Sequence, residues 1–159
     1  MFDFVLGLSS RKTTKEVEDE LLRLLGIRDL SEASKRWPAF WKVTVADKST
    51  WDQQTHEMWL EFLGCPATIE IGYTLDSQTD WDQYQVAKDV MAVSAAQLVE
   101  RVDAVAATLL FEIDRVLMRR ACGMLYLVNK HFSSWKNPAI LAKIPGPYEF
   151  RDDLEAVFP

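Results

Sequence analysis

Two histidines and two cysteines are the residues of this 159-residue chain that could serve as nucleophiles, general bases or metal ligands. His56 and His131 stand far apart, and neither belongs to a recognisable nucleophile or metal motif. Cys65 and Cys122 form no CxxC motif, so we expect two buried free thiols. A Cys65–His131 pair remains an open alternative, because such partners meet only in the fold. The pattern predicts no catalytic residue and no metal site.

Cofactor-binding motifs are equally scarce. The sequence contains no GxSxG, no HExxH and no glycine-rich phosphate loop. Six glycines in the whole chain leave little material for a cofactor-binding loop. We therefore expect a protein that has no cofactor and is not an enzyme.

The net charge of −6 is unevenly distributed along the chain. Six basic residues and no acid lie between Arg115 and Lys143, whereas acids outnumber bases nine to two between Ala46 and Val90. An acidic surface favours a basic protein partner over nucleic acid, although a merely solvated surface has the same composition. The charge pattern thus predicts a protein partner and no nucleic acid.

Six tryptophans are the most unusual feature of the composition. Trp51 and Trp81 are each followed directly by an aspartate. Trp is enriched at the energetic centres of protein interfaces, and acids beside it suit a basic partner. The alternative is that most of the tryptophans belong to the core. We predict a partner-binding set in the loops that border the third strand and the long helix: Asp47, Trp51, Asp52, Asp76, Asp80, Trp81 and Asp82.

The length fits one domain that spans residues 1–159. No apolar run approaches the roughly 20 residues that a membrane-spanning helix needs. The opening residues, Met1 to Phe4, lack the basic region of a signal peptide and include an acid. We expect a cytoplasmic protein that does not contact a membrane.

Hydrophobic periodicity predicts the elements that position these residues. Thr13 and Glu16 have the spacing of a capping box, and Gly26 is a typical helix stop. The stretch Ala107–Lys130 reads as a three-stranded meander, with polar turns at 112–115 and 120–123. The other predicted elements are strands at 2–8, 40–46 and 67–75, helices at 13–25 and 80–101, and an acidic tail at 148–159. Residues 55–63 suit a short helix, although the alternation around Trp59 also fits a strand.

This order, β-α-β-(α)-β-α-β-β-β, predicts an α+β fold. We expect a single domain with an antiparallel sheet of about six strands and two main helices packed on one face.

Several segments, taken together, resemble a known family. They are the first strand with its capped helix (2–26), TIEIGYTLD (68–76), LLFEIDRVLMRRACGMLYLVN (109–129), Trp135 and PYEFRD (147–152). In order and spacing they are similar to the swarm-inhibition (Sit) type of polymorphic-toxin immunity protein. The resemblance implies a small cytoplasmic protein that neutralises a cognate bacterial toxin by forming a tight complex, and it assigns no binding residues. The alternative is a non-catalytic adaptor or chaperone for a secreted effector.

Overall fold

The structure is a computed structural model that describes residues 1–112 and 114–154. Ile113, in the first predicted turn of the meander, lies outside the described residues. Residues 155–159, the end of the predicted acidic tail, also lie outside them.

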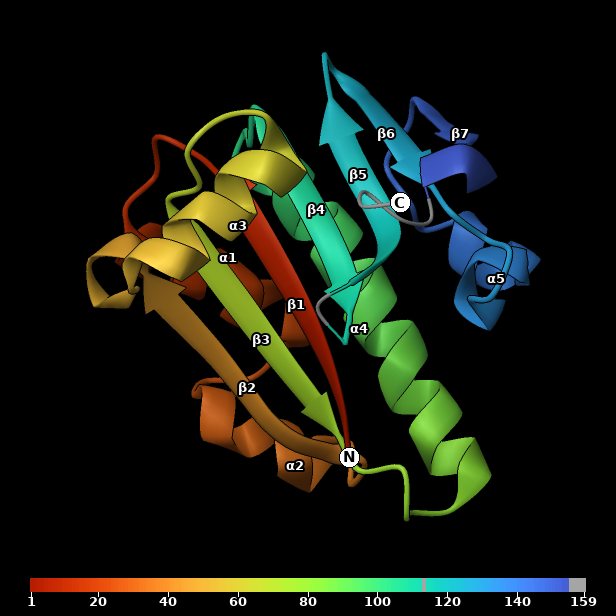
Figure 1. Cartoon of the computed structure of the whole chain (residues 1–159). Helices are drawn as coiled ribbons and strands as arrows, with labels where there is room; N and C mark the ends of the chain where they lie inside the picture. Colours follow the sequence, from red (N-terminus) through yellow and green to blue (C-terminus); the bar gives the residue numbers. More distant parts are fainter. Residues whose placement is uncertain (113, 155–159) are drawn as a thin grey trace.

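A single seven-stranded sheet forms the centre of the molecule, with the strands in the order β2-β3-β1-β4-β5-β6-β7 (Figure 1). Every neighbouring pair is antiparallel except β6 and β7, which are parallel. The predicted α+β class and the meander are confirmed, and the short strand β7 makes the sheet mixed. The strands are β1 (Phe2–Ser9), β2 (Phe40–Asp47), β3 (Ile69–Leu75), β4 (Ala106–Phe111), β5 (Arg115–Ala121), β6 (Met124–Leu127) and β7 (Tyr148–Phe150).

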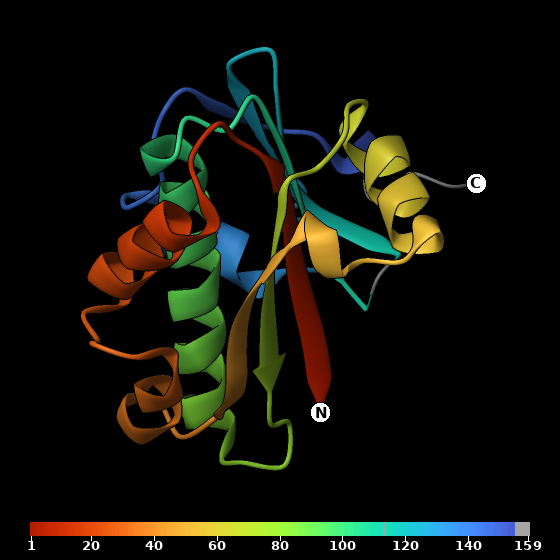
Figure 2. The same ribbon diagram turned by 90° about the vertical axis from the view of Figure 1, so that its left-hand side faces the viewer.

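The helices form a layer on each face of the sheet (Figure 2). The two main helices, α1 and α4, cover one face, as predicted, and α3 lies on the other. The helices are α1 (Thr14–Leu25), α2 (Ala33–Arg36), α3 (Gln53–Leu63), α4 (Trp81–Arg101) and α5 (Pro138–Leu141). Single 3-10 turns are η1 (Leu30–Glu32), η2 (Lys48–Thr50), η3 (Ser133–Lys136) and η4 (Asp152–Leu154).

The ends of the main helices follow the signals in the sequence. The Thr13 side chain accepts the Glu16 N–H (3.2 Å), and the Glu16 carboxylate accepts the Thr13 N–H (3.1 Å), so the capping box at α1 is complete. Gly26 ends α1 in the left-handed conformation at φ 66°. Asp80 caps α4 by accepting the Gln83 N–H. These caps fix where the long helix begins, and therefore where Trp81 emerges.

The larger core lies between the sheet and the α1–α4 layer. Alternate residues of β1 (Phe4, Leu6 and Leu8) point into it. Fully buried Ala87 and Ala95 give α4 a narrow face toward the sheet. The small side chains let this helix approach the strands closely.

A buried lysine joins the middle of α4 to the segment after β6. Lys88 Nζ donates to Ser133 Oγ (2.7 Å) and lies 5.4 Å and 5.8 Å from the ring centroids of Phe132 and Tyr84. Burial lowers the pKa of Lys88, while neighbouring Asp89 acts in the opposite direction. The rings replace part of the hydration that the ammonium loses, and the contact helps to hold the chain after β6 on this layer.

The second core lies between α3 and the opposite face of the sheet. Fully buried Trp59 packs over β1 at Gly7, and its Nε1 donates to Glu70 Oε2 of β3 (2.8 Å). At the end of α3, the carbonyl oxygen of Phe62 accepts hydrogen bonds from Thr108 Oγ1 (3.2 Å) and Arg119 Nη2 (2.5 Å). The face of β3 that carries Glu70 is therefore partly covered by α3.

We expect Gly7→Ala to destabilise the fold, because a Cβ there would lie 2.3 Å from the Trp59 ring. Overpacking of this kind costs about 1–3 kcal/mol of unfolding free energy, which urea titration would measure. Gly72→Ala is the matched control on the same face of the sheet, where the Cβ would meet only the Thr44 hydroxyl (2.8 Å). Equal losses of unfolding free energy in the two variants would show that the packing of Trp59 does not require a residue without a side chain at position 7.

Candidate protein-binding surfaces

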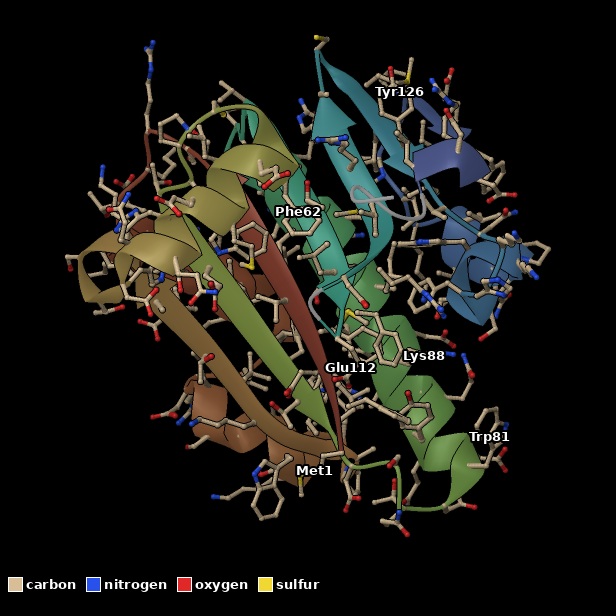
Figure 3. All side chains as sticks on the ribbon, in the orientation of Figure 1. Met1, Phe62, Trp81, Lys88, Glu112 and Tyr126 are labelled. Atoms are coloured by element: carbon tan, nitrogen blue, oxygen red, sulfur yellow. The ribbon has the colours of Figure 1, made fainter. Side chains whose placement is uncertain are left out.

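The structure divides the seven predicted binding residues into two groups. β2 and β3 are antiparallel, with Asp47 opposite Ile69 and Phe40 opposite Leu75. The loop at 47–52 and the loop at 76–82 consequently lie at opposite ends of β3, about 20 Å apart along the strand. Figure 3 shows the same division, with Trp81 and Met1 both toward the lower end of the view and Phe62 of α3 toward the upper end.

Asp47 and Asp52, in the first group, both have structural roles. Asp47 accepts the Ser49 N–H (2.8 Å) and the Thr14 hydroxyl (2.9 Å). Asp52 caps α3 by accepting the Thr55 N–H (2.8 Å). These backbone hydrogen bonds lower the pKa of both carboxyl groups, since they favour the charged form.

The second group surrounds the start of α4. Asp76 accepts the Gln78 N–H (2.8 Å), which shapes the loop after β3. Asp80 is the N-cap of α4, and Asp82 lies in its first turn, where a negative charge is favourable. Two of these three acids therefore also stabilise local backbone. Their charges nonetheless remain at the surface beside Trp81.

The tryptophans differ sharply in exposure. Trp81 is 68% exposed, as its predicted role requires, whereas Trp51 is half-buried and packs against the second core. Trp59 and Trp135 are fully buried. Trp41 on edge strand β2 is 62% exposed and was not among the predicted residues. In the sequence, neither the position of Trp41 in a predicted strand nor the neighbouring Lys42 indicates an interface.

Two exposed aromatic rings, Trp81 and Phe2 at the start of β1, are joined by the buried ring of Tyr84. The Trp81 ring contacts Tyr84 (centroids 5.8 Å apart), and Tyr84 contacts Phe2 (6.2 Å), which is 37% exposed. Burial raises the pKa of Tyr84, and the charge of Glu112 raises it further, so a carboxylate lies close to the rings. We call this region the aromatic surface: Phe2, Trp81 and Tyr84 with the carboxylates of Asp80, Asp82 and Glu112.

A cavity of about 440 Å³ lies on the other face of the sheet, beneath the first part of α3. Two carboxylates, those of Asp52 and Glu70, line it together with the Trp51 ring, and no basic residue belongs to its described lining. Trp51 Nε1 is buried, and no acceptor among the described residues lies within hydrogen-bonding distance of it. We call this the α3 cavity; its apolar walls are Val5, Met58 and Leu110.

The residues suited to nucleophilic or metal chemistry do not form one site. The prediction of two buried thiols is wrong, because Cys65 is half-buried and Cys122 is exposed, although both are free. Cys122 lies in a tight turn at φ 52°, and its side chain is exposed. His56 packs against the Trp51 ring (5.3 Å). Among residues 1–112 and 114–154, no group of three or more His, Cys, Asp or Glu is placed to hold a metal ion.

The connections of the sheet also bear on the Cys65–His131 alternative. Cys65 precedes β3 and His131 follows β6, and three strands separate β3 from β6 in the sheet.

In the part of the chain that the structure describes, no helix is long and apolar enough to cross a membrane.

Comparisons with known proteins give one distant likeness. No family model matches the sequence, and no curated protein matches it. Among solved structures, the chain is similar to a chain of the CdiA-CT/CdiI toxin and immunity complex from Burkholderia pseudomallei. The identity is 16% and the TM-score is 0.48, with 71% of this chain and 93% of that chain covered.

The half-buried position of Trp51 leads to a stability prediction. Trp51→Ala should lower the unfolding free energy by about 2 kcal/mol, because it removes a ring packed against the second core. Trp81→Ala is the matched control and should stay within about 0.5 kcal/mol of wild type, since its ring is largely solvated. Chemical denaturation measures both. A large loss for Trp81→Ala would place that ring in the core and argue against the aromatic surface.

The cap at α3 gives a prediction about pH. The pKa of Asp52 is lowered in the folded state from 3.8, so its charge stabilises the fold above pH 3.8 and this contribution is lost as the pH falls through the folded value. Asp52→Asn keeps an acceptor for the Thr55 N–H but cannot titrate. The stability of wild type relative to Asp52→Asn should therefore decrease from neutral pH to below pH 3.8. A difference that does not change with pH would contradict the assignment.

Proposed function

We propose that this protein is an immunity protein, which binds a cognate bacterial toxin in the cytoplasm and neutralises it by forming a tight complex. The observation that carries the proposal is the aromatic surface, where a Trp that is 68% exposed stands among carboxylates. Large exposed aromatic rings are costly to leave in water and are enriched at the centres of interfaces. The resemblance of the sequence to the swarm-inhibition family supports the same function.

The aromatic surface combines the two properties that an inhibitor acting by occupancy needs. Carboxylates at Asp80, Asp82 and Glu112 attract a basic partner and speed its association. The Trp81 ring then buries a large area at little entropic cost, which slows dissociation. An interface of roughly 800 Å² on each partner is enough for tight binding. The toxin is accordingly expected to present basic residues around an apolar pocket.

A second apolar feature adjoins Asp82. A hollow of about 190 Å³ is lined by Trp37, Pro38 and Val86 of the α2–β2 connection and α4. Energetically important interface residues are usually surrounded by contacts that exclude water. The hollow offers such contacts beside Asp82, which follows Trp81 in the first turn of α4. The remaining predicted residues, Asp47, Trp51 and Asp52, lie too far away to share this contact and form a separate candidate region.

Co-expression tests the function directly. The gene beside this one would be expressed in a sensitive host, with and without this protein, and survivors counted. We expect wild type to restore survival. A neighbour that kills equally in both cases would contradict the proposal for that pair, and binding without rescue would identify an adaptor or chaperone instead.

The role of Trp81 has a matched control in Trp41. Trp81→Ala should weaken the complex at least about tenfold, because an anchoring Trp contributes more than about 1.4 kcal/mol to binding. Trp41→Ala removes a ring that is equally exposed but lies beside Lys42 on the edge strand, and it should leave the affinity within about twofold. Titration calorimetry with the purified toxin domain measures both. The opposite ranking would place the toxin on the edge strand.

A further inference from the structure

The outer edge of β2 is an open side of the sheet. β2 stands at one end of the strand order, so it has a neighbour only on its β3 side. Among residues 1–112 and 114–154, no backbone group outside β3 forms a hydrogen bond with the backbone of residues 41–46. Figure 2 faces this edge, with α1 and α2 on one side of the strand and α3 on the other. Such a row of unpaired N–H and C=O groups is a template for a further strand.

The edge has few of the features that keep strands apart. β2 has eight residues and no proline, and it is longer than the roughly five or six residues of a typical strand. Lys42 and a bulge at Trp41 discourage pairing, but both lie at its first end, and residues 43–47 pair with β3 without interruption. The Trp41 ring at this edge is 62% exposed. The length and regularity of the strand therefore favour pairing with another strand.

A second copy of the chain can pair with this edge in only a few registers. Two copies of one strand pair antiparallel about a two-fold axis, and opposed side chains must point to the same face of the sheet. An axis at Thr44 gives the longest overlap, residues 41–47, and opposes the two Thr44 side chains, which is a favourable pair. An axis at Val45 would instead oppose Lys42 and Lys48. The register about Thr44 is therefore preferred.

The side chains around Thr44 complement one another in this register. On the face toward the larger core, Val43 of each copy opposes Val45 of the other. On the other face, Lys42 opposes Ala46, whose neighbour on β3 is Glu70. Lys42 of one copy and Glu70 of the other then lie two strand spacings apart, about 10 Å between backbones, which the two side chains can span across the small Ala46. The edge thus matches itself in shape and in charge.

We propose that the free edge of β2 pairs with the same edge of a second copy, with Thr44 on the two-fold axis. The resulting dimer has one continuous sheet. A single pair of strands buries less surface than the roughly 1,600 Å² of a typical stable interface, so the dimer is reversible and forms as the concentration rises. This proposal concerns the protein alone and does not rest on the proposed immunity function.

Sedimentation velocity of the full-length protein tests the dimer without a toxin. The 18.3 kDa chain should sediment as a monomer when dilute and as a species of twice that mass when concentrated. A chain that stays monomeric at every concentration would overturn the proposal. Growth beyond two copies would also overturn it, because pairing about a two-fold axis leaves no free β2 edge.

Two charge variants test the register. Ala46→Lys places a lysine opposite Lys42, and Lys42→Glu places an acid near Glu70 of the other copy. Each contact occurs twice in the dimer, so each variant should raise the dissociation constant at least about tenfold. The double variant Lys42→Glu/Ala46→Lys opposes a glutamate and a lysine, and it should return the constant to within about threefold of wild type. Residues 42 and 46 lie about 13 Å apart along one strand, so the rescue has to arise between copies.

Gln54→Lys is the matched control, because it adds the same charge at an exposed position of α3 away from the edge. It should leave the dissociation constant unchanged. Equal weakening by Gln54→Lys and Ala46→Lys would show an effect of net charge alone, and failure of the double variant to rescue would exclude this register. Either result overturns the proposal. The unfolding midpoint of each variant, measured on dilute monomer, shows that the fold is retained.

Binding of the toxin domain is a separate measurement. A protein that is monomeric alone, but whose toxin complex is weakened by Ala46→Lys, would assign the edge to a strand of the toxin and overturn the dimer. No toxin enters the sedimentation experiments, so a failure of the proposed immunity function would leave their outcome unchanged.

Discussion

The contact between the Trp59 ring and the backbone of Gly7 is the constraint on which the two-sided architecture depends. The indole occupies the space where any side chain at position 7 would stand, and its N–H is fixed on Glu70. This contact brings α3 down onto the sheet and creates a second core. The same ring also lines the α3 cavity.

The antiparallel pairing of β2 and β3 decides which acids can act together. β2 begins at Phe40 opposite Leu75 and ends at Asp47 opposite Ile69. The acids of the 47–52 loop and those of the 76–82 loop are therefore separated by the length of a strand. The result is two acidic regions at opposite ends of the strand, each with its own aromatic residue. One presents an exposed ring to a partner, whereas the other keeps Trp51 partly packed and leaves a cavity beside it.

Local signals in the sequence predicted most of the fold because they are complete within a few residues. The capping box at Thr13 and Glu16 and the αL stop at Gly26 involve only neighbours, so α1 could be placed from the sequence. The face on which α3 packs could not be placed, because it depends on Gly7, Glu70 and Arg119, which are distant in the chain. The parallel pairing of β7 with β6 was also absent from the prediction, because a strand of three residues is too short to show a hydrophobic pattern.

The candidate binding residues were harder to predict than the elements that carry them. An aspartate after a tryptophan occurs at Trp51 and at Trp81, yet one ring is half-buried and the other is exposed. The difference arises from tertiary packing: Trp51 rests against His56 and the second core, whereas Trp81 begins a helix whose apolar face turns toward the sheet from Tyr84 onward. Exposure of a large side chain therefore had to come from the structure.

Capping and binding are compatible roles for the same acids. A carboxylate that accepts a backbone N–H uses one oxygen and keeps its full charge, and the hydrogen bond favours that charged form. Asp52 and Asp80 can thus hold the start of a helix and still present negative charge at the surface. Alanine at these positions would remove both properties together, whereas asparagine removes only the charge. The chemistry of the caps therefore makes the electrostatic part of recognition separable from the stability of the fold.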